Sequence, residues 1–317
     1  MTLTTLVPLV LRASIALTVA GLGLRTPPGD VRALLHDRSR LARSLVAMNV
    51  VMPLLALAVA AAFHLHPAVE VAIAMLAVSP VPPLLPGTQL KAGGSAPYAV
   101  GLLFATAVLS VVTVPAAVLL AGAAAGEPRH LDAAAVARLV GTSVLGPLAA
   151  GCAVRRLAPG LAARAAGPAG AAASVLLAAG CVPLLAVAFP QVVSLLGSGT
   201  LAAVALLVAA GLATGHLLGG PRAEDRVVLA LATASRHPGV AVAAAAAIAP
   251  DETRVPAAVL LYLLTGMGAT SLYVRLCHPP PPPGEPVPAP PAGGTPGRPP
   301  LAPSLASPRR TGAAGEP

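Results

Sequence analysis

The sequence contains no tryptophan, and only 2% of its residues are aromatic. Charged residues are also scarce: they make up 10% of the chain, whereas a soluble globular domain usually carries about a quarter. With 56% hydrophobic residues, there is too little polar surface to cover a soluble fold. These shortages exclude an ordinary soluble domain and predict a chain that lies in lipid.

The net charge of +9 does not predict nucleic-acid binding, because the basic residues are scattered through short loops without aromatic partners. Three cysteines, Cys152, Cys181 and Cys277, show no metal-ligand spacing and are interpreted as small buried hydrophobes. No nucleophile–base pair or phosphate-binding loop is recognisable, and the glycine-rich stretches are typical of helix packing. The sequence therefore does not predict an enzyme.

Apolar stretches of about 20 residues, long enough to span a bilayer as helices, recur along most of the chain. We predict nine membrane-spanning helices, at about residues 4–24, 41–63, 68–86, 97–122, 132–154, 169–189, 195–220, 227–249 and 255–276. The first stretch lacks a basic segment before its apolar run, so we expect no cleaved signal peptide. The predicted fold class is an all-α membrane protein embedded in a lipid bilayer.

Lysine and arginine alternate between the predicted loops. The loops after the first, third, fifth and seventh helices hold ten of these residues, whereas the other loops hold only Arg129 and Arg254. Cytoplasmic loops of membrane proteins are enriched in lysine and arginine. We therefore predict a multi-pass protein of the plasma (inner) membrane with its N-terminus outside and its C-terminus in the cytoplasm.

The composition changes completely after residue 277, where a run of prolines and glycines begins. Such a sequence can neither form a helix nor bury a core. We predict a polytopic transmembrane domain over residues 1–277 and a disordered, proline-rich cytoplasmic tail over residues 278–317. The tail could also be a ligand for a proline-reading domain.

Two predicted helices are interrupted by proline. The third contains Ser79, Pro80, Val81, Pro82 and Pro83, and the eighth contains Ser235–Gly239. The interruptions lie five helices apart, so the two helices run in opposite directions. Inverted repeats whose interrupted helices meet at the membrane midplane are typical of secondary transporters. We predict inverted five-helix repeats with the two interrupted helices crossing at the midplane.

Polar side chains at the interruptions are the candidate substrate-binding residues. Arg236 lies within the second interruption, where an arginine in lipid is costly and usually functional or paired. All eleven acidic residues fall in loops, at helix ends or in the tail, so we find no counter-ion for Arg236 and expect an anionic substrate or helix-end carbonyls. His237 is a candidate proton carrier or a neutral hydrogen-bonding residue. Ser235, Pro82 and Pro83 complete this set.

Three further polar residues lie inside apolar helices. Asn49 either joins helices by a hydrogen bond or belongs to the site. Thr106 and Ser110 either belong to the site or bond to carbonyls of their own helix.

The order of these features resembles the bile acid:sodium symporter family. The resemblance is carried by residues 21–27, by Asn49 to Pro53, by residues 79–94, by Ser110 with Pro115, and by residues 232–241. It implies a ten-helix inverted-repeat fold with a core and a panel domain, of which the first helix is missing here. It also implies transport of organic anions, often coupled to sodium.

The resemblance is weakest at the positions that bind sodium in the family. Two of them are Ala232 and Arg236 here, and the first interruption offers prolines and leucines. Only Asn49 and Ser110 keep the character of sodium ligands. Our hypothesis is that the charge of Arg236 replaces the cation, so that transport proceeds without sodium.

Two other functions remain open at this point. The chain could export another solute on the same fold, such as arsenite or an auxin-type compound, although no cysteine lies in the third helix. It could also be a membrane sensor or scaffold that does not transport and acts through the proline-rich tail. Deletion of the tail distinguishes these functions, because a transporter keeps its activity and a scaffold loses it.

Overall fold

The computed structural model describes residues 3–27, 29, 34, 36–124, 126, 130–197 and 199–277. All regular elements within these residues are helical. The predicted tail, residues 278–317, lies outside the described residues, as do Arg32 and Arg129.

The helices follow one another with short connections and in two places with π-helical segments, named η1 and η2. In chain order they are α1 (Leu3–Arg25), α3 (Arg38–Val46), η1 (Ala47–Val51), α4 (Met52–Ala62), α5 (Pro67–Val78), α6 (Leu85–Lys91), α7 (Ala96–Ala124), α8 (Ala133–Val140), η2 (Gly141–Leu145), α9 (Gly146–Leu157), α10 (Pro159–Ser194), α11 (Thr200–Leu218), α12 (Ala223–Ala234), α13 (Pro238–Ile248) and α14 (Val255–Cys277).

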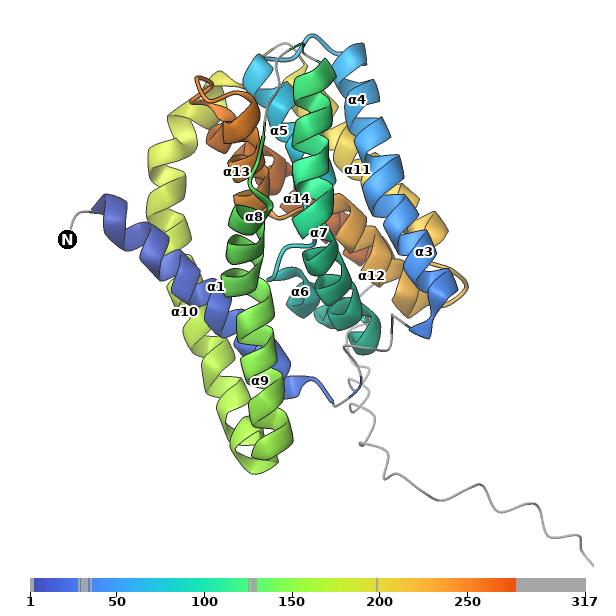
Figure 1. Cartoon of the computed structure of the whole chain (residues 1–317), viewed down its shortest axis with the longest axis vertical. Helices are drawn as coiled ribbons and strands as arrows, with labels where there is room; N and C mark the ends of the chain where they lie inside the picture. Colours follow the sequence, from blue (N-terminus) through green and yellow to red (C-terminus); the bar gives the residue numbers. More distant parts are fainter. Residues whose placement is uncertain are drawn as a thin grey trace, which may run out of the picture. The chain divides into compact units, whose positions relative to one another are not determined.

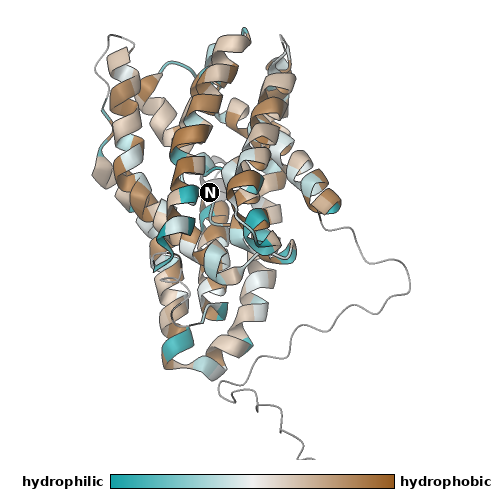
Figure 2. Ribbon diagram, turned by 90° about the vertical axis from the view of Figure 1, so that its right-hand side faces the viewer, coloured by the Kyte–Doolittle hydropathy of each residue, from teal (hydrophilic) through white to brown (hydrophobic). Residues whose placement is uncertain are grey.

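The described residues contain seven helical segments that are long and apolar enough to cross a membrane. They are Arg38–Ala62, Ala96–Ala124, Ala133–Leu157, Pro159–Pro183, Thr200–Leu218, Ala223–Ile248 and Val255–Cys277. Figure 2 shows that hydrophobic residues dominate these long helices. The prediction of a multi-pass, all-helical membrane protein is confirmed, whereas the number nine remains a prediction.

The predicted boundaries differ from the structure at several helices, including the third and the sixth. The predicted third helix, 68–86, is two helices, because α5 ends at Val78 and α6 begins at Leu85. The predicted sixth helix, 169–189, is only the middle of α10, which runs over 36 residues and includes Arg164, expected in a loop. Three prolines, Pro168, Pro183 and Pro190, lie inside α10 and do not end it.

Helices α1, α9 and α10 pack on one another (Figure 1). Small residues allow this close approach, as is common between helices in lipid. A Cβ atom built on Gly151 of α9 would lie 2.2 Å from the carbonyl oxygen of Ala20 in α1. Most other helices, including α5, α7, α11, α12 and α13, contribute to one large apolar cluster, which contains the interrupted helices.

Helices α11 and α12 are in close backbone contact at Gly215. A Cβ atom built on this glycine would lie 2.4 Å from the carbonyl oxygen of Leu229 and 2.5 Å from Cα of Ala230. Because both are backbone atoms, the contact cannot be relieved by a side-chain rotation. Gly215 therefore fixes the position of α12 against α11.

We expect Gly215→Ala to destabilise the protein by about 1–3 kcal/mol, the usual cost of overpacking a filled interior. The measurement is the thermal unfolding midpoint in detergent. The matched control is Gly266→Ala in α14, where an added Cβ meets nothing within 4 Å and alanine favours the helix by up to about 1 kcal/mol. Equal midpoints for the two variants would contradict this account of the α11–α12 contact.

Candidate functional site

The first predicted interruption begins where α5 ends. Ser79 follows the helix in an extended conformation. The next residue is Pro80, and the residue before a proline is disfavoured in the helical conformation. The chain therefore leaves the helix at Ser79, and the carbonyl of Ser79 has no donor from α5. Downstream, the backbone N–H of Val81 donates to Oγ1 of Thr106 in α7, at 3.3 Å.

The second interruption lies between α12 and α13, at Ser235, Arg236 and His237. Pro238 cannot donate to the carbonyl of Ala234, the last residue of α12. The hydroxyl of Tyr262 in α14 donates to that carbonyl instead, at 2.8 Å. The backbone N–H of His237 donates to the carbonyl of Pro80 at 2.9 Å. The two interruptions therefore touch each other directly.

A third open carbonyl comes from the π-helical segment η1. Within it the backbone N–H of Met52 donates to Ala47, one residue further back than in an α-helix. The carbonyl of Met48 consequently loses its usual donor, the backbone N–H of Met52. In the π-helical register the donor would come from Pro53, which has no backbone N–H. Met48 is buried, so its carbonyl needs a partner from elsewhere.

Arg236 provides donors to two of these carbonyls. Its Nη1 donates to Ser79 at 3.1 Å, and its Nη2 donates to Met48 at 3.0 Å. The residue is 1% exposed, and no carboxylate of the described residues pairs with it. Neutral carbonyls compensate a buried charge only in part. The crossing of the two interrupted helices is therefore a cationic centre inside the protein.

Two N–H donors at this centre have no partner within the described residues. Nδ1 of His237 accepts a hydrogen bond from the backbone N–H of Val240, at 3.3 Å. The proton of a neutral imidazole must then lie on Nε2, which is buried and unpartnered, as is Nε of Arg236. Both lie at the N-terminus of α13, where the helix dipole also favours negative charge. An anion bound at this position would accept hydrogen bonds from both N–H groups.

The predicted residues Thr106, Ser110 and Asn49 differ in their hydrogen-bond partners. Thr106 contacts the first interruption, as described above. Ser110 donates to the carbonyl of Ala107 at 2.7 Å, and Asn49 donates to the carbonyl of Leu45 at 3.3 Å. Both bonds lie within one helical run. This was one of the two interpretations of Ser110, whereas for Asn49 it matches neither interpretation, because the amide bonds to its own helix and not to a neighbouring one.

The remaining predicted residues lie in the interruptions themselves. Pro83 is buried, Pro82 is half-buried, and the carbonyl of Pro82 accepts from the backbone N–H of Leu85 at the start of α6. Ser235 is half-buried, and its N–H closes the last turn of α12 on Leu231. They shape the interruptions, and among the described residues none of their side chains forms a hydrogen bond with Arg236.

Sequence reasoning missed Tyr262, whose hydroxyl completes the second interruption. A signal was present, because each proline inside a helix identifies one carbonyl that needs a new donor, and the chain has only three tyrosines. Met48 was missed because its open carbonyl depends on the π-helical register, which no residue pattern in the sequence predicts.

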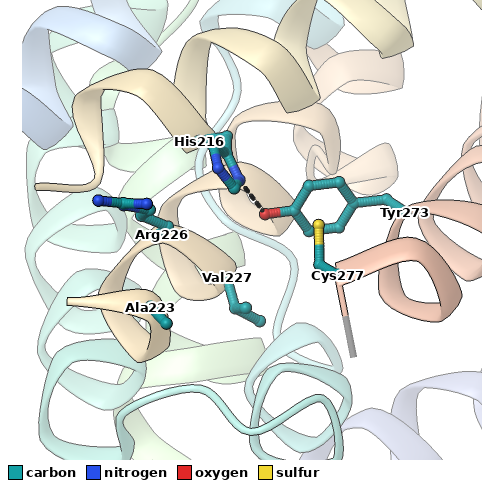
Figure 3. Close-up of a pocket in the computed structure, with 6 residues that line it drawn as sticks. All are labelled: His216, Ala223, Arg226, Val227, Tyr273 and Cys277. Carbon is teal, nitrogen blue, oxygen red and sulfur yellow. Dashed lines mark hydrogen bonds between the residues drawn. The ribbon is translucent and has the colours of Figure 1, made fainter. Parts of the chain in front are cut away.

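A separate cavity of about 270 Å³ lies between the end of α11, the start of α12 and the end of α14. Figure 3 shows its lining residues, His216, Ala223, Arg226, Val227, Tyr273 and Cys277. Nδ1 of His216 and the hydroxyl of Tyr273 are hydrogen-bonded at 2.7 Å. No group of three histidine, cysteine or acidic side chains able to hold a metal ion is found in the part of the chain that the structure describes.

We expect Thr106→Val to destabilise the protein by about 1–3 kcal/mol, because the buried N–H of Val81 loses its acceptor. Hydrogen exchange of the Val81 amide, with the unfolding midpoint, measures this loss. Thr113→Val is the matched control in the same helix, since Thr113 bonds only to the carbonyl of Leu109 in its own helix. Unchanged protection of the Val81 amide in Thr106→Val would contradict the proposed contact.

The model of the Sodium Bile acid symporter family matches residues 14–195, more than half of the chain. The matched region includes η1, the first interruption and Thr106, and it ends before Arg236 and His237. None of the curated proteins compared with the chain matches it.

Proposed function

Because the chain belongs to the sodium bile acid symporter family, we propose that it is a secondary-active membrane transporter of a small organic anion. The family is one of transporters, which agrees with the apolar, multi-pass helical fold. The substrate would bind where the two interrupted helices meet. The single observation that carries this proposal is the buried Arg236 at their contact, with an unpartnered N–H on each of two adjacent residues.

The proposed membrane arrangement keeps nine spans and inverted five-helix repeats. Helix α1 and the pair α5–α6 would add two spans to the seven long apolar segments. The contact between the two interruptions agrees with a crossing at the midplane. The loop charges favour an outer N-terminus and a cytoplasmic C-terminus in the plasma membrane. Residues 1–277 would form the transporter domain and residues 278–317 the tail.

An anionic substrate follows from the charge of this centre. The guanidinium of Arg236 has no acidic partner among the described residues, so an entering anion would supply the missing negative charge. Nε of Arg236 and Nε2 of His237 can donate to it without breaking any bond in the structure. Carboxylate and sulfonate oxygens are suitable acceptors.

The residues at the crossing do not fit a sodium ion. Sodium in such transporters is held by carbonyls of unwound helices, and here Met48 and Ser79 already accept from Arg236. The position of a family carboxylate ligand is Ala232, which is buried and apolar. Arg236 would act as a tethered cation, and transport would proceed without sodium.

The test is uptake of taurocholate and a panel of smaller radiolabelled organic anions into proteoliposomes, with sodium or choline outside. Wild-type uptake of at least one anion is expected to be equal in the two salts. Arg236→Ala should reduce it by tenfold or more, and millimolar guanidinium should restore part of it by refilling the vacated position.

Arg12→Ala is the control, because Arg12 is an exposed arginine of α1 and its removal should leave uptake within about twofold of wild type. Uptake that needs sodium, or that persists in Arg236→Ala, would contradict the proposal that Arg236 acts as a tethered cation. Absence of uptake for every anion would instead oppose the proposed substrate class.

A further inference from the structure

Asp225, in the first turn of α12, is a buried carboxylate. It is 3% exposed, and it is the one acidic residue in the buried set of the described residues. We expected every acidic residue in a loop, at a helix end or in the tail, and predicted this helix to begin at residue 227. Packing of α12 against its neighbours instead places Asp225 inside the protein, where an ionised carboxylate is costly unless fully paired.

The pairing of Asp225 is incomplete. Its Oδ2 lies 3.4 Å from Nη2 of Arg40 in α3, and this arginine also lies 3.3 Å from Oδ2 of Asp37. The guanidinium of Arg40 is stacked over the ring of Tyr98 in α7, 5.3 Å from its centroid. Oδ1 of Asp225 is buried and has no hydrogen-bond partner in the described structure.

Other titratable groups near Asp225 come from several elements. Arg222, the residue before α12, and Glu224, in its first turn, lie near Asp225, and both are exposed. On α6, Lys91 is exposed. On α11 and α14, the groups near this turn line the cavity beside Ala223, Arg226 and Val227 (Figure 3), and they are His216, Tyr273 and Cys277. Arg40 is therefore the charge in direct contact with Asp225.

A second buried acceptor without a donor lies where α6 packs against α12. Gln89 of α6 is 0% exposed, and its Nε2 donates to the carbonyl of Val228 at 2.8 Å. Val228 is one helical turn from Asp225. Oε1 of Gln89 has no partner in the described residues, like Oδ1 of Asp225. The first two turns of α12 thus carry or contact two buried oxygens, on Asp225 and on Gln89, that can only accept hydrogen bonds and have no donor.

The nearby hydroxyl groups cannot fill this gap. Ser44 donates its proton to the carbonyl of Arg40 at 2.7 Å, so the 2.8 Å contact between Ser44 and Tyr98 must use the Tyr98 proton. Both hydroxyl protons are therefore in use. Nε of Arg40 is a buried donor without a hydrogen-bond partner, but it lies 3.3 Å from Oδ2 of Asp37 in the ion pair with that carboxylate. One additional proton on the carboxyl group of Asp225 would turn an acceptor into a donor and provide a partner for Gln89.

We propose that Asp225 is a proton-binding residue of the transport cycle, and that Oε1 of Gln89 accepts the hydrogen bond of the protonated carboxyl group. A proton from water adds to Oδ1, the carboxylate becomes a neutral carboxylic acid, and Arg40 loses its charged partner. A sodium ion fits poorly, because it needs several oxygen ligands and Arg40 lies beside the same carboxylate. Proton binding can be tested alone, whereas its coupling to anion movement rests on the proposed function.

The connection to the crossing runs through α12 itself. Asp225 lies near the start of this helix. The last residue of the helix, Ala234, is nine residues later, about 14 Å along the axis, and Arg236 follows two residues beyond it. A change in the Arg40 pairing acts on the same rigid element that leads into the second interruption. Proton binding at Asp225 could therefore alter the position of the anion site without contact with it.

The direct test is infrared difference spectroscopy of the full-length protein in membranes, titrated from about pH 5 to pH 9, a range centred near neutrality. We expect the carbonyl-stretch band of a protonated carboxylic acid to appear as the pH falls and to be missing in Asp225→Asn. Glu224→Gln is the matched control, because Glu224 is the exposed acid of the same turn and its loss should leave this band unchanged. In Gln89→Leu the band should move to the higher frequency of a carboxyl group without a hydrogen bond.

Absence of the band in the wild type over this range, or its persistence in Asp225→Asn, overturns the proposal, since Asp225 would then stay ionised. If Asp225→Asn does not fold, the band position in Gln89→Leu decides the assignment, and an unshifted band contradicts it. None of these measurements depends on a transported anion, so a failed proposed function leaves the result interpretable.

The coupling is tested with taurocholate, whose sulfonate stays charged and so does not follow a pH gradient passively. If one proton accompanies each anion, an inward gradient of one pH unit should contribute about a tenfold factor to its accumulation, since a pH unit corresponds to a factor of ten in equilibrium. Asp225→Asn should lose this factor and keep exchange of external for internal taurocholate. Full gradient-driven accumulation in Asp225→Asn contradicts a coupling role.

Discussion

The structure of the crossing depends on prolines that cannot donate a hydrogen bond. Pro53 and Pro238 cannot donate to the carbonyls of Met48 and Ala234, and Pro80 favours the extended conformation in which the chain leaves the helix at Ser79, so three carbonyls are left open. Such groups must find other donors, and side chains from distant parts of the chain provide them. Arg236 joins Met48 and Ser79, and Tyr262 reaches Ala234. The open carbonyls are thus what holds the interrupted helices together.

A cation that is part of the chain has consequences for energy coupling. A soluble ion enters and leaves the site in each cycle, and its gradient drives the substrate. Arg236 stays in place, so the positive charge at the crossing is constant and contributes no driving force by itself. In the proposed transport cycle, another group must then change its charge. We propose that Asp225, the acidic residue in the buried set of the described chain, has this role.

Much of this arrangement could be predicted from the sequence. Apolar length identified most of the helices, and the clustered prolines identified both interruptions, because the chemistry of proline is local. Partners could not be predicted in the same way, since the contact between His237 and Pro80 joins residues far apart in the chain. The burial of Asp225 was missed for a related reason. Its burial arises from packing around the start of α12, while hydropathy along the chain places the polar residues there in a loop.

The central claim is that the guanidinium of Arg236 occupies the place of a soluble cation. Isothermal titration calorimetry of the purified protein with sodium chloride, in choline chloride of equal ionic strength, tests it most directly. The account predicts no saturable sodium binding by the wild type, and sodium or guanidinium binding that becomes measurable in Arg236→Ala. Saturable, sodium-specific binding by the wild-type protein would contradict it, because the carbonyls of Met48 and Ser79 would then have to serve a metal ion.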